Sequence, residues 1–275
     1  MASVSNLAGS IIDPDFLSDV ESEIHFTTTR DLKRTLYKFF QHVKKNNNYD
    51  HTVLIVGFPP ENFTIDDDYD KESLLPKTRK ALYFAESKIL ILTMPDRLHE
   101  EASRLFNRQV ELKLNEMNCR EEIIPCGGAT ARMKGVSKEP DECWRPINGD
   151  LTCIFEAAVL ESDRVLHRYA KIWLEHPEQK VTQVVTMMIG RARPEIILRV
   201  WKQGQEERDT RAEHPPRATL HQTVRVTLAE GDIRLSFQLL FKRKPRSGTA
   251  EKDTIIFASE IEFIARVVWQ DMGFM

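Results

Sequence analysis

Two acidic residues, Asp141 and Glu156, stand where carboxylates can do chemistry. Asp141 follows Pro140 at the start of a predicted strand, and Glu156 lies inside the apolar run 151–159. A carboxylate in such a run is costly to bury unless it is paired, protonated or bound to a cation. Carboxylates on neighbouring strands can share one hard cation, Mg²⁺ or Mn²⁺, which needs few protein ligands besides waters and phosphate oxygens. Such an ion activates a water and polarises a phosphodiester for hydrolysis.

Each of these acids also has a purely structural interpretation. Asp141 is typical of a turn that follows a proline. Glu156 is compatible with a buried structural carboxylate that pairs with an arginine such as Arg132 or Arg145. The residue patterns alone leave both interpretations open beside the catalytic one.

The elements that must position these acids follow from periodicity and capping. The middle of the chain is predicted to run helix, three strands, helix, strand (αβββαβ), which indicates a mixed α/β class. A helix is expected from Pro95-Asp96 to about Met117, and a second begins at Ser162-Asp163 and stops before Pro177. The expected strands are 123–133, a short one from Asp141, 151–159, 181–189 and 195–201.

An ordered series of segments between Met94 and Trp201 resembles the PD-(D/E)XK restriction-endonuclease-like superfamily, and more closely a group of uncharacterised fungal proteins within it. The flanks, 1–90 and 205–275, resemble that group only loosely. The segments are Met94-Pro95 with His99-Glu100, Gly127-Gly128-Ala129-Thr130, Lys138-Glu139-Pro140-Asp141-Glu142-Cys143-Trp144-Arg145-Pro146, Ile154-Phe155-Glu156, Glu161-Ser162, Leu166 with Ala170-Lys171-Ile172-Trp173-Leu174, and Ile196 to Trp201.

The resemblance implies a central mixed sheet flanked by helices and a catalytic divalent metal held by Asp141 and Glu156. Glu100 on the preceding helix would complete the metal site. The superfamily motif also has a lysine two residues after the strand glutamate, and here that position is Ala158. Lys171, or Lys138 before Pro140, is a candidate replacement if the lysine has migrated.

Other side chains in the same region have simpler interpretations. His99 and His167 are expected on helix surfaces rather than as ligands, and Lys171 is also typical of a solvated helix position. Trp144, Trp173 and Trp201 are expected to pack in or beside the core rather than to stack on bases.

The flanking regions are expected to extend this core. We predict an N-terminal α/β extension over 1–95, a nuclease-like core over 96–203, and a C-terminal hairpin with a helix over 204–275 that packs on the core as one compact unit. The individual expectations are an irregular segment 1–30, helices 30–43 and 73–84, strands 52–58 and 88–94, a hairpin of 222–228 with 233–241, a basic loop 242–253 and a helix 259–269.

Charge is unevenly distributed along the chain. The 275 residues carry a net charge of −3, yet residues 191–250 hold 13 basic and 7 acidic residues, a net +6. A basic block can attract phosphates if it folds onto one face, or it can be a solvated surface. The overall charge therefore does not exclude a nucleic-acid substrate.

The four cysteines form no C-x-x-C pair, so we expect reduced thiols rather than a zinc site or a disulfide framework. The start of the chain lacks the features of a signal peptide, and no apolar run approaches the ~20 residues of a membrane span. We therefore expect an intracellular protein, nuclear or cytoplasmic, with no membrane partner. A homodimer is compatible with the sequence.

These features predict a metal-dependent nuclease that hydrolyses phosphodiester bonds of DNA or RNA with Mg²⁺ or Mn²⁺. Ala158 in place of the motif lysine favours an alternative, a nuclease-fold protein that has lost catalysis and binds nucleic acid or another protein.

Overall fold

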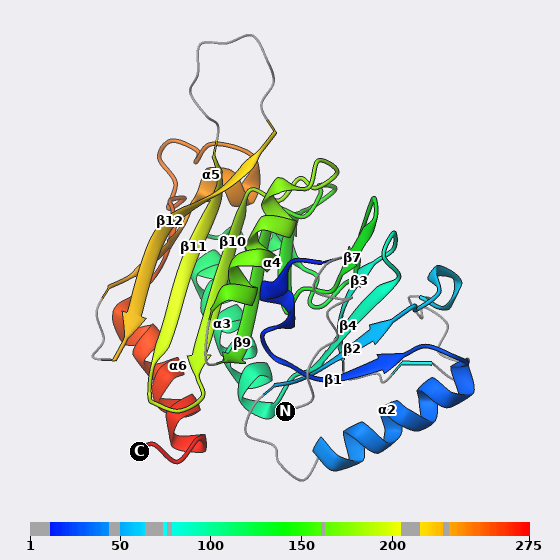
Figure 1. The fold of residues 1–275 in the computed structure, drawn as a ribbon. Helices are drawn as coiled ribbons and strands as arrows, with labels where there is room; N and C mark the ends of the chain where they lie inside the picture. Colours follow the sequence, from blue (N-terminus) through cyan, green and yellow to red (C-terminus); the bar gives the residue numbers. More distant parts are fainter. Residues whose placement is uncertain are drawn as a thin grey trace. The chain divides into compact units, whose positions relative to one another are not determined.

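The computed structural model divides into two compact units (Figure 1). One unit consists of Met1–Arg97 with Thr130–Glu139, and the other of Leu98–Ala129 with Pro140–Met275. The predicted core 96–203 differs from the structure in that 130–139 belongs to the first unit, whereas the C-terminal region lies in the same unit as most of the core, as predicted. The described residues are 12–43, 50–63, 74–75, 79–160, 163–204, 215–227 and 231–275.

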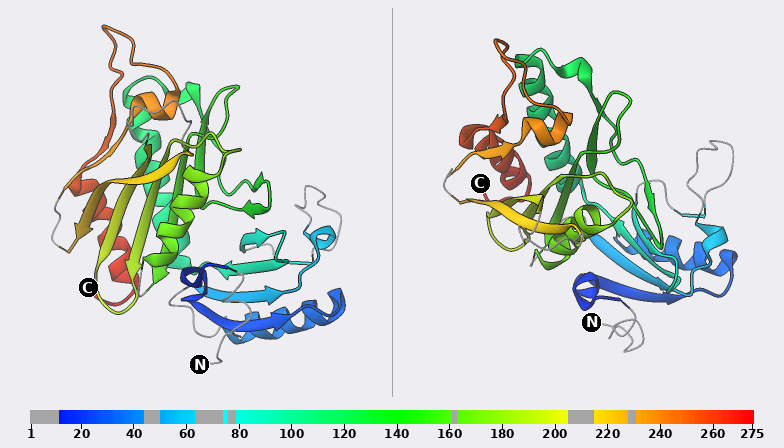
Figure 2. Two further views of the ribbon diagram at one scale, coloured as in Figure 1. Left: turned by 45° about the horizontal axis from the view of Figure 1, so that its top comes forward. Right: turned by 90° about the horizontal axis from the view of Figure 1, so that it is seen from above.

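The first unit is a six-stranded sheet with a helix, α2 (Thr29–Val43), along one face (Figure 2). The helix buries Leu32, Leu36 and Phe40, which join Val53 and Ile55 of the sheet in one hydrophobic core. Short 3-10 helices lie at Pro14–Leu17 and Pro60–Asn62. The strands lie in the order β1 (Val20–His25), β2 (His51–Val56), β4 (Ile89–Met94), β3 (Lys80–Phe84), β7 (Val136–Lys138) and β6 (Ala131–Met133).

Two predictions for this unit are wrong. The segment 1–30 was expected to be irregular, but Val20–His25 forms β1 and pairs in parallel with β2. Lys80–Phe84 was expected in a helix, but it is a strand that pairs with both β4 and β7. A strand with neighbours on both sides can be apolar on both faces, so its short run resembles a buried helix.

The second unit contains the predicted αβββαβ order. The helix α3 (Arg97–Glu116) precedes β5 (Ile123–Pro125), β8 (Glu142–Pro146) and β9 (Cys153–Leu160), which pair antiparallel in that order. The helix α4 (Arg164–Glu175) then crosses to β10 (Gln183–Gly190), which is parallel to β9. The predicted mixed α/β class is therefore confirmed.

Strands β11 (Ile196–Gly204) and β12 (Arg217–Val226) extend this sheet antiparallel to β10, giving the order β12-β11-β10-β9-β8-β5. Figures 1 and 2 show α4 on one face of the sheet and α3 with α6 (Ala258–Asp271) on the other. Every residue of β9 and β10 is buried, because helices cover both faces of these central strands.

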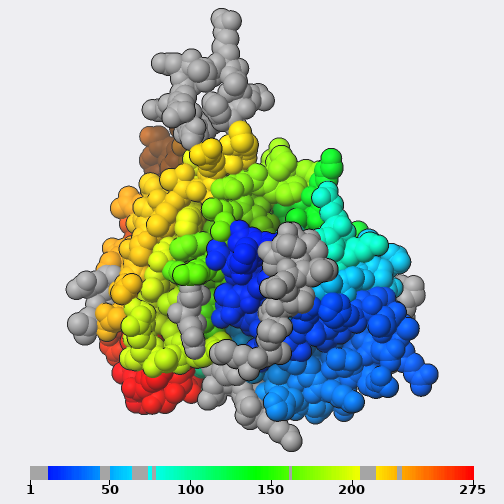
Figure 3. Space-filling model, in the orientation of Figure 1, coloured from blue at the N-terminus to red at the C-terminus, as the bar shows by residue number. Residues whose placement is uncertain are grey.

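The predicted C-terminal hairpin is wrong. β12 pairs with β11, whereas Ile233–Leu235 forms β13 and pairs with β14 (Thr254–Ile256) in a separate two-stranded sheet. Phe237–Phe241, expected in the second strand of the hairpin, is the short helix α5, capped by Ser236. β12 is an edge strand with mostly exposed side chains, visible in yellow on the surface in Figure 3.

Within the described ranges, no helix is both long enough and apolar enough to cross a membrane.

Because α3 packs tightly on the sheet, we expect truncation of one side chain at this contact to lower the free energy of unfolding strongly. Phe106 is fully buried and stacks on Phe155 of β9 with ring centroids 4.3 Å apart. We expect Phe106→Ala to lower the free energy of unfolding by about 3–5 kcal/mol, measured by urea titration. The control Phe263→Ala, at a 48% exposed position, should change it by less than about 0.5 kcal/mol. Equal effects of the two would show that α3 does not pack as described.

Candidate functional site

The strand pairing brings Asp141 and Glu156 opposite each other. β8 and β9 pair with Glu142 opposite Phe155, so the register places the preceding residue, Asp141, opposite Glu156. The contact between Asp141 Oδ2 and the backbone N–H of Ala157, at 2.6 Å, fixes this alignment. Both acids are buried, with exposed fractions of 6% and 2%.

Glu156 points to the face of the sheet that α4 covers. Its neighbour Phe155 stacks on Phe106 of α3, and successive side chains of a strand alternate between faces. On the α4 side, the indole Nε1–H of Trp173 donates to Glu156 Oε1 at 2.5 Å. Trp173 is fully buried, as expected for a core tryptophan, and it also satisfies part of the carboxylate.

The carboxylate of Asp141 is held from two directions. One oxygen accepts the Ala157 N–H, and the other lies 2.9 Å from Nε2 of His99 near the start of α3. The side chains of His99 and Asp141 are 4% and 3% exposed, so this contact is shielded from solvent. An imidazole beside a buried carboxylate fixes its orientation and offsets part of the cost of its charge.

His99 was expected on the helix surface, and that prediction is wrong. The helical spacing places His99 on the buried face of α3, because it lies three, four and seven residues before Ala102, Ser103 and Phe106, all of which are buried. A histidine in line with the apolar stripe of a helix faces inward, and an inward histidine needs a polar partner. Here that partner is Asp141.

Two other predicted residues are not brought to this pair. The side chain of Glu100 is 42% exposed and lies 3.9 Å from Arg104, one helical turn later. Lys171 is exposed and stands two residues before Trp173, about 200° around the helix from it. In the described part of the chain, no hydrogen bond or ion pair joins Lys171 to Asp141 or Glu156. Lys138 is buried on β7 of the first unit.

A row of polar side chains continues from Glu156 across the sheet. Thr186 of β10 is in register with Glu156, and Arg199 of β11 is in register with Thr186. Thr186 accepts a hydrogen bond from Trp201 Nε1 at 3.1 Å, and Arg199 pairs with Asp163 at the start of α4. The Arg199–Asp163 pair attaches α4 to the sheet through polar groups, whereas the Thr186–Trp201 bond joins β10 to β11 within the sheet.

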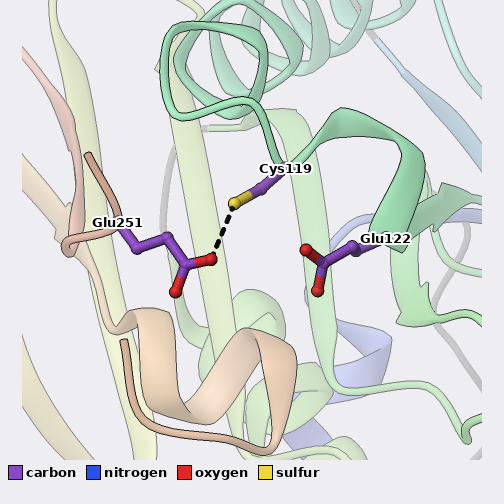
Figure 4. Close-up of side chains that lie close together, drawn as sticks. All are labelled: Cys119, Glu122 and Glu251. Atoms are coloured by element: carbon purple, nitrogen blue, oxygen red, sulfur yellow. Dashed lines mark hydrogen bonds between the residues drawn. The ribbon is translucent and has the colours of Figure 1, made fainter. Parts of the chain in front are cut away.

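A separate group of possible ligands lies elsewhere in the second unit. Cys119, Glu122 and Glu251 each offer an atom within 4.8 Å of the others (Figure 4). Among the described residues this is the one group of three His, Cys, Asp or Glu side chains with that spacing, so Asp141, Glu156 and Glu100 do not form one. Cys119 Sγ donates to Glu251 Oε1 at 3.6 Å.

Arginines already neutralise these two glutamates. Arg243 lies 2.7 Å from both Glu122 and Glu251, and Arg246 also pairs with both. Hydrogen bonds from Arg243, against the effect of burial, hold the pKa of Glu251 well below its ordinary range. Burial and the nearby Glu251 raise the pKa of the Cys119 thiol. A protonated thiol and two guanidinium groups disfavour a metal here, so the group is a structural ion-pair cluster.

Part of the basic block 191–250 is also paired with acids. Besides the cluster above, Arg193 and Arg225 both contact Glu195, and Arg199 contacts Asp163. These pairs reduce the positive charge available to phosphates. Residues 205–214 and 228–230 of this block lie outside the described residues.

Comparisons with known proteins give a likeness to a solved structure and none to a family model. No family model matches the chain, and no curated protein matches it. The structure is similar to that of a "putative nuclease belonging to DUF820" from Anabaena variabilis, with a TM-score of 0.38 and 9% identity over 67% of this chain and 90% of that chain. A likeness at that TM-score does not bear on substrate or activity.

The ion-pair cluster predicts a loss of stability in acid. Arg243 and Arg246 lower the pKa of Glu251 and, against the effect of burial, that of Glu122, whose ordinary value is 4.5. The ionised forms therefore stabilise the folded state above that pH, and this contribution is lost as the pH falls through the lowered values. Unfolding free energies measured by urea titration between about pH 7 and pH 3 should decline.

Matched variants identify the groups responsible. Glu251→Gln should be less stable than wild type at pH 7 and should lose less stability on acidification. Glu121→Gln, at a side chain 94% exposed, should follow the wild-type curve. If Glu251→Gln retains the full wild-type slope, Glu251 does not supply the acid-sensitive contribution.

Proposed function

We propose that this chain is a nuclease-like protein of the PD-(D/E)XK type that hydrolyses phosphodiester bonds of DNA or RNA with a divalent metal. The observation that carries the proposal is the pairing of Asp141 with Glu156 across β8 and β9, within an αβββαβ unit. The narrower resemblance to fungal proteins stays a prediction from the sequence.

The donor set suits a hard cation by its chemistry, although Asp141 is contacted by His99 of α3 and Glu156 by Trp173 of α4, on opposite faces of the sheet. Two carboxylates from adjacent strands match the one or two that Mg²⁺ or Mn²⁺ takes from a protein, with waters and phosphate oxygens as the remaining ligands. When bound, the ion would supply a water of lowered pKa and polarise the phosphodiester. Asp141 and Glu156 would hold it.

His99 would act as a positioning residue in this site. Its contact with Asp141 Oδ1 holds the carboxylate in one orientation, while the Ala157 N–H holds the second oxygen. Groups that orient metal ligands in this way typically change metal affinity or activity by about 10–100-fold when removed. Glu100 and Lys171 have no part in the proposed mechanism.

A second candidate is a nuclease fold that binds nucleic acid without cutting it. Ala158 supports this candidate, since the motif lysine that stabilises developing negative charge is missing. The hydrogen bond from Trp173 to Glu156 supports it as well, because a carboxylate satisfied inside the fold has less need of a cation.

Cleavage assays separate the two candidates. Single- and double-stranded DNA and RNA would be incubated with the protein and Mg²⁺ or Mn²⁺. We expect wild type to cut at least one of them, Asp141→Asn and Glu156→Gln to lose on the order of 100-fold or more, and His99→Gln to lose about 10–100-fold. The exposed Glu121→Gln serves as the matched control and should cut like wild type.

Metal binding provides an independent measurement. Calorimetric titration with Mn²⁺ should show weaker binding for Asp141→Asn and Glu156→Gln than for Glu121→Gln, with folding checked by circular dichroism. No cleavage by wild type, together with salt-dependent gel retardation of nucleic acid, would favour the binding module. Equal Mn²⁺ binding by all variants would exclude the proposed metal site.

A further inference from the structure

Two of the four cysteines face each other across the edge of the second sheet. β5 and β8 pair with Pro125 opposite Trp144, and the register continues to place Cys126 opposite Cys143. The backbone N–H of Cys126 donates to the carbonyl of Cys143 at 2.8 Å, which fixes this alignment.

This placement matches the geometry of a disulfide. Directly opposed residues of an antiparallel pair have Cα atoms about 4.5–5.5 Å apart, inside the range of about 4.4–6.8 Å that disulfides span. Opposed side chains also share a face of the sheet, so the two Cβ atoms point in the same direction. Because opposed Cβ atoms are about 4.5–5.5 Å apart and those of a disulfide about 3.5–4.5 Å, the cross-link requires rotation of the side chains and a small approach of the two strands.

The two thiols differ in access to solvent in the way that a two-step oxidation needs. Cys126 is partly exposed after β5, whereas Cys143 is fully buried within β8. Their other contacts are weak, since Cys126 Sγ lies 3.6 Å from the Ile124 carbonyl and Cys143 Sγ lies 3.1 Å from that of Gly127. Neither thiol gives up a strong interaction on oxidation.

We infer that Cys126 and Cys143 form a reversible disulfide on exposure to a peroxide. The Cys126 thiolate attacks hydrogen peroxide, giving a sulfenic acid and hydroxide. The Cys143 sulfur then attacks the sulfenic sulfur, forms the S–S bond and releases water, so two thiols and one peroxide give one disulfide and two waters. A dithiol reductant reverses the reaction.

The cross-link would act on the segment that holds the candidate acid pair. Cys143 of β8 lies two residues after Asp141, which directly precedes this strand, and β8 is held at its other edge by β9. Joining β8 covalently to β5 would restrict the movement of this strand. The inference does not depend on the proposed nuclease activity, because the disulfide is measured directly.

Intact-mass spectrometry of the full chain tests the inference. The reduced protein would be treated with hydrogen peroxide, quenched, and alkylated under denaturing conditions. We expect a loss of two alkylatable thiols and of 2 Da before alkylation, both reversed by dithiothreitol. Trypsin should then release residues 121–132 cross-linked to residues 139–164, which contain Cys143 and Cys153.

Three variants locate the bond. Cys153→Ser should retain the cross-linked peptide, which assigns the bond to Cys143, and Cys119→Ser should retain it as well. Cys126→Ser should abolish it. Sulfinic or sulfonic acid on Cys126 without a cross-link, a cross-link through Cys119 or Cys153, or four unchanged thiols would each overturn the inference.

Discussion

The second unit is organised around a carboxylate that its sequence places inside the sheet. Glu156 lies in an eight-residue strand of which every residue is buried. Transfer of an ionised carboxylate into such surroundings costs several kcal/mol unless hydrogen bonds or charges compensate for it. The stability of the folded state therefore depends by about this amount on where the neighbours of Glu156 lie. The indole of Trp173 must reach it from α4, and the opposite residue of β8 must accommodate it.

The contacts that offset the cost of burying Glu156 involve both strands and both neighbouring helices. Asp141 lies opposite it where β8 begins, and the carboxylate of Asp141 takes up the Ala157 N–H in β9. His99 contacts Asp141 from the first turn of α3, and Trp173 contacts Glu156 from the last turns of α4. Two helices on opposite faces of the sheet are thus fixed relative to two strands by one pair of acids. A change at any of these contacts leaves a buried polar group without its partner.

The parts of the fold that could be predicted have a clear hydrophobic pattern that is compatible with only one type of secondary structure. α3 and α4 have long apolar stripes at helical spacing, and β9 and β10 are short apolar runs on either side of a helix, a sequence typical of a parallel crossover. β3 could not be distinguished from a helix, because consecutive residues on both of its faces are buried and the alternation that identifies strands is lost. Residues 233–241 looked like the second strand of a hairpin, but Ser236 caps a helical turn instead.

The site was predictable to a similar degree and for similar reasons. Buried carboxylates stand out in an apolar sequence, so Asp141 and Glu156 could be selected without knowing which residues contact them. Their partners could not, because the contacts of His99 and Trp173 depend on the packing of helices that lie 42 and 17 residues away from those acids. The surface residues Glu100 and Lys171 were selected by analogy with a motif, and periodicity places both away from the inward stripes.

The lysine of the motif matters differently for two properties, binding of a divalent metal and hydrolysis of a phosphodiester. Ala158 shares a face with Glu156 beneath α4 and is 6% exposed, so its position offers no cation where a phosphodiester would develop negative charge. Arg199, a cation on the same face, is paired with Asp163. Two carboxylates can hold a divalent ion without any lysine, because the ion needs ligands and not a positive neighbour. Hydrolysis is more demanding, since the ion alone must then stabilise the charge of the transition state. Under the proposed function, metal binding would therefore persist even where turnover is slow.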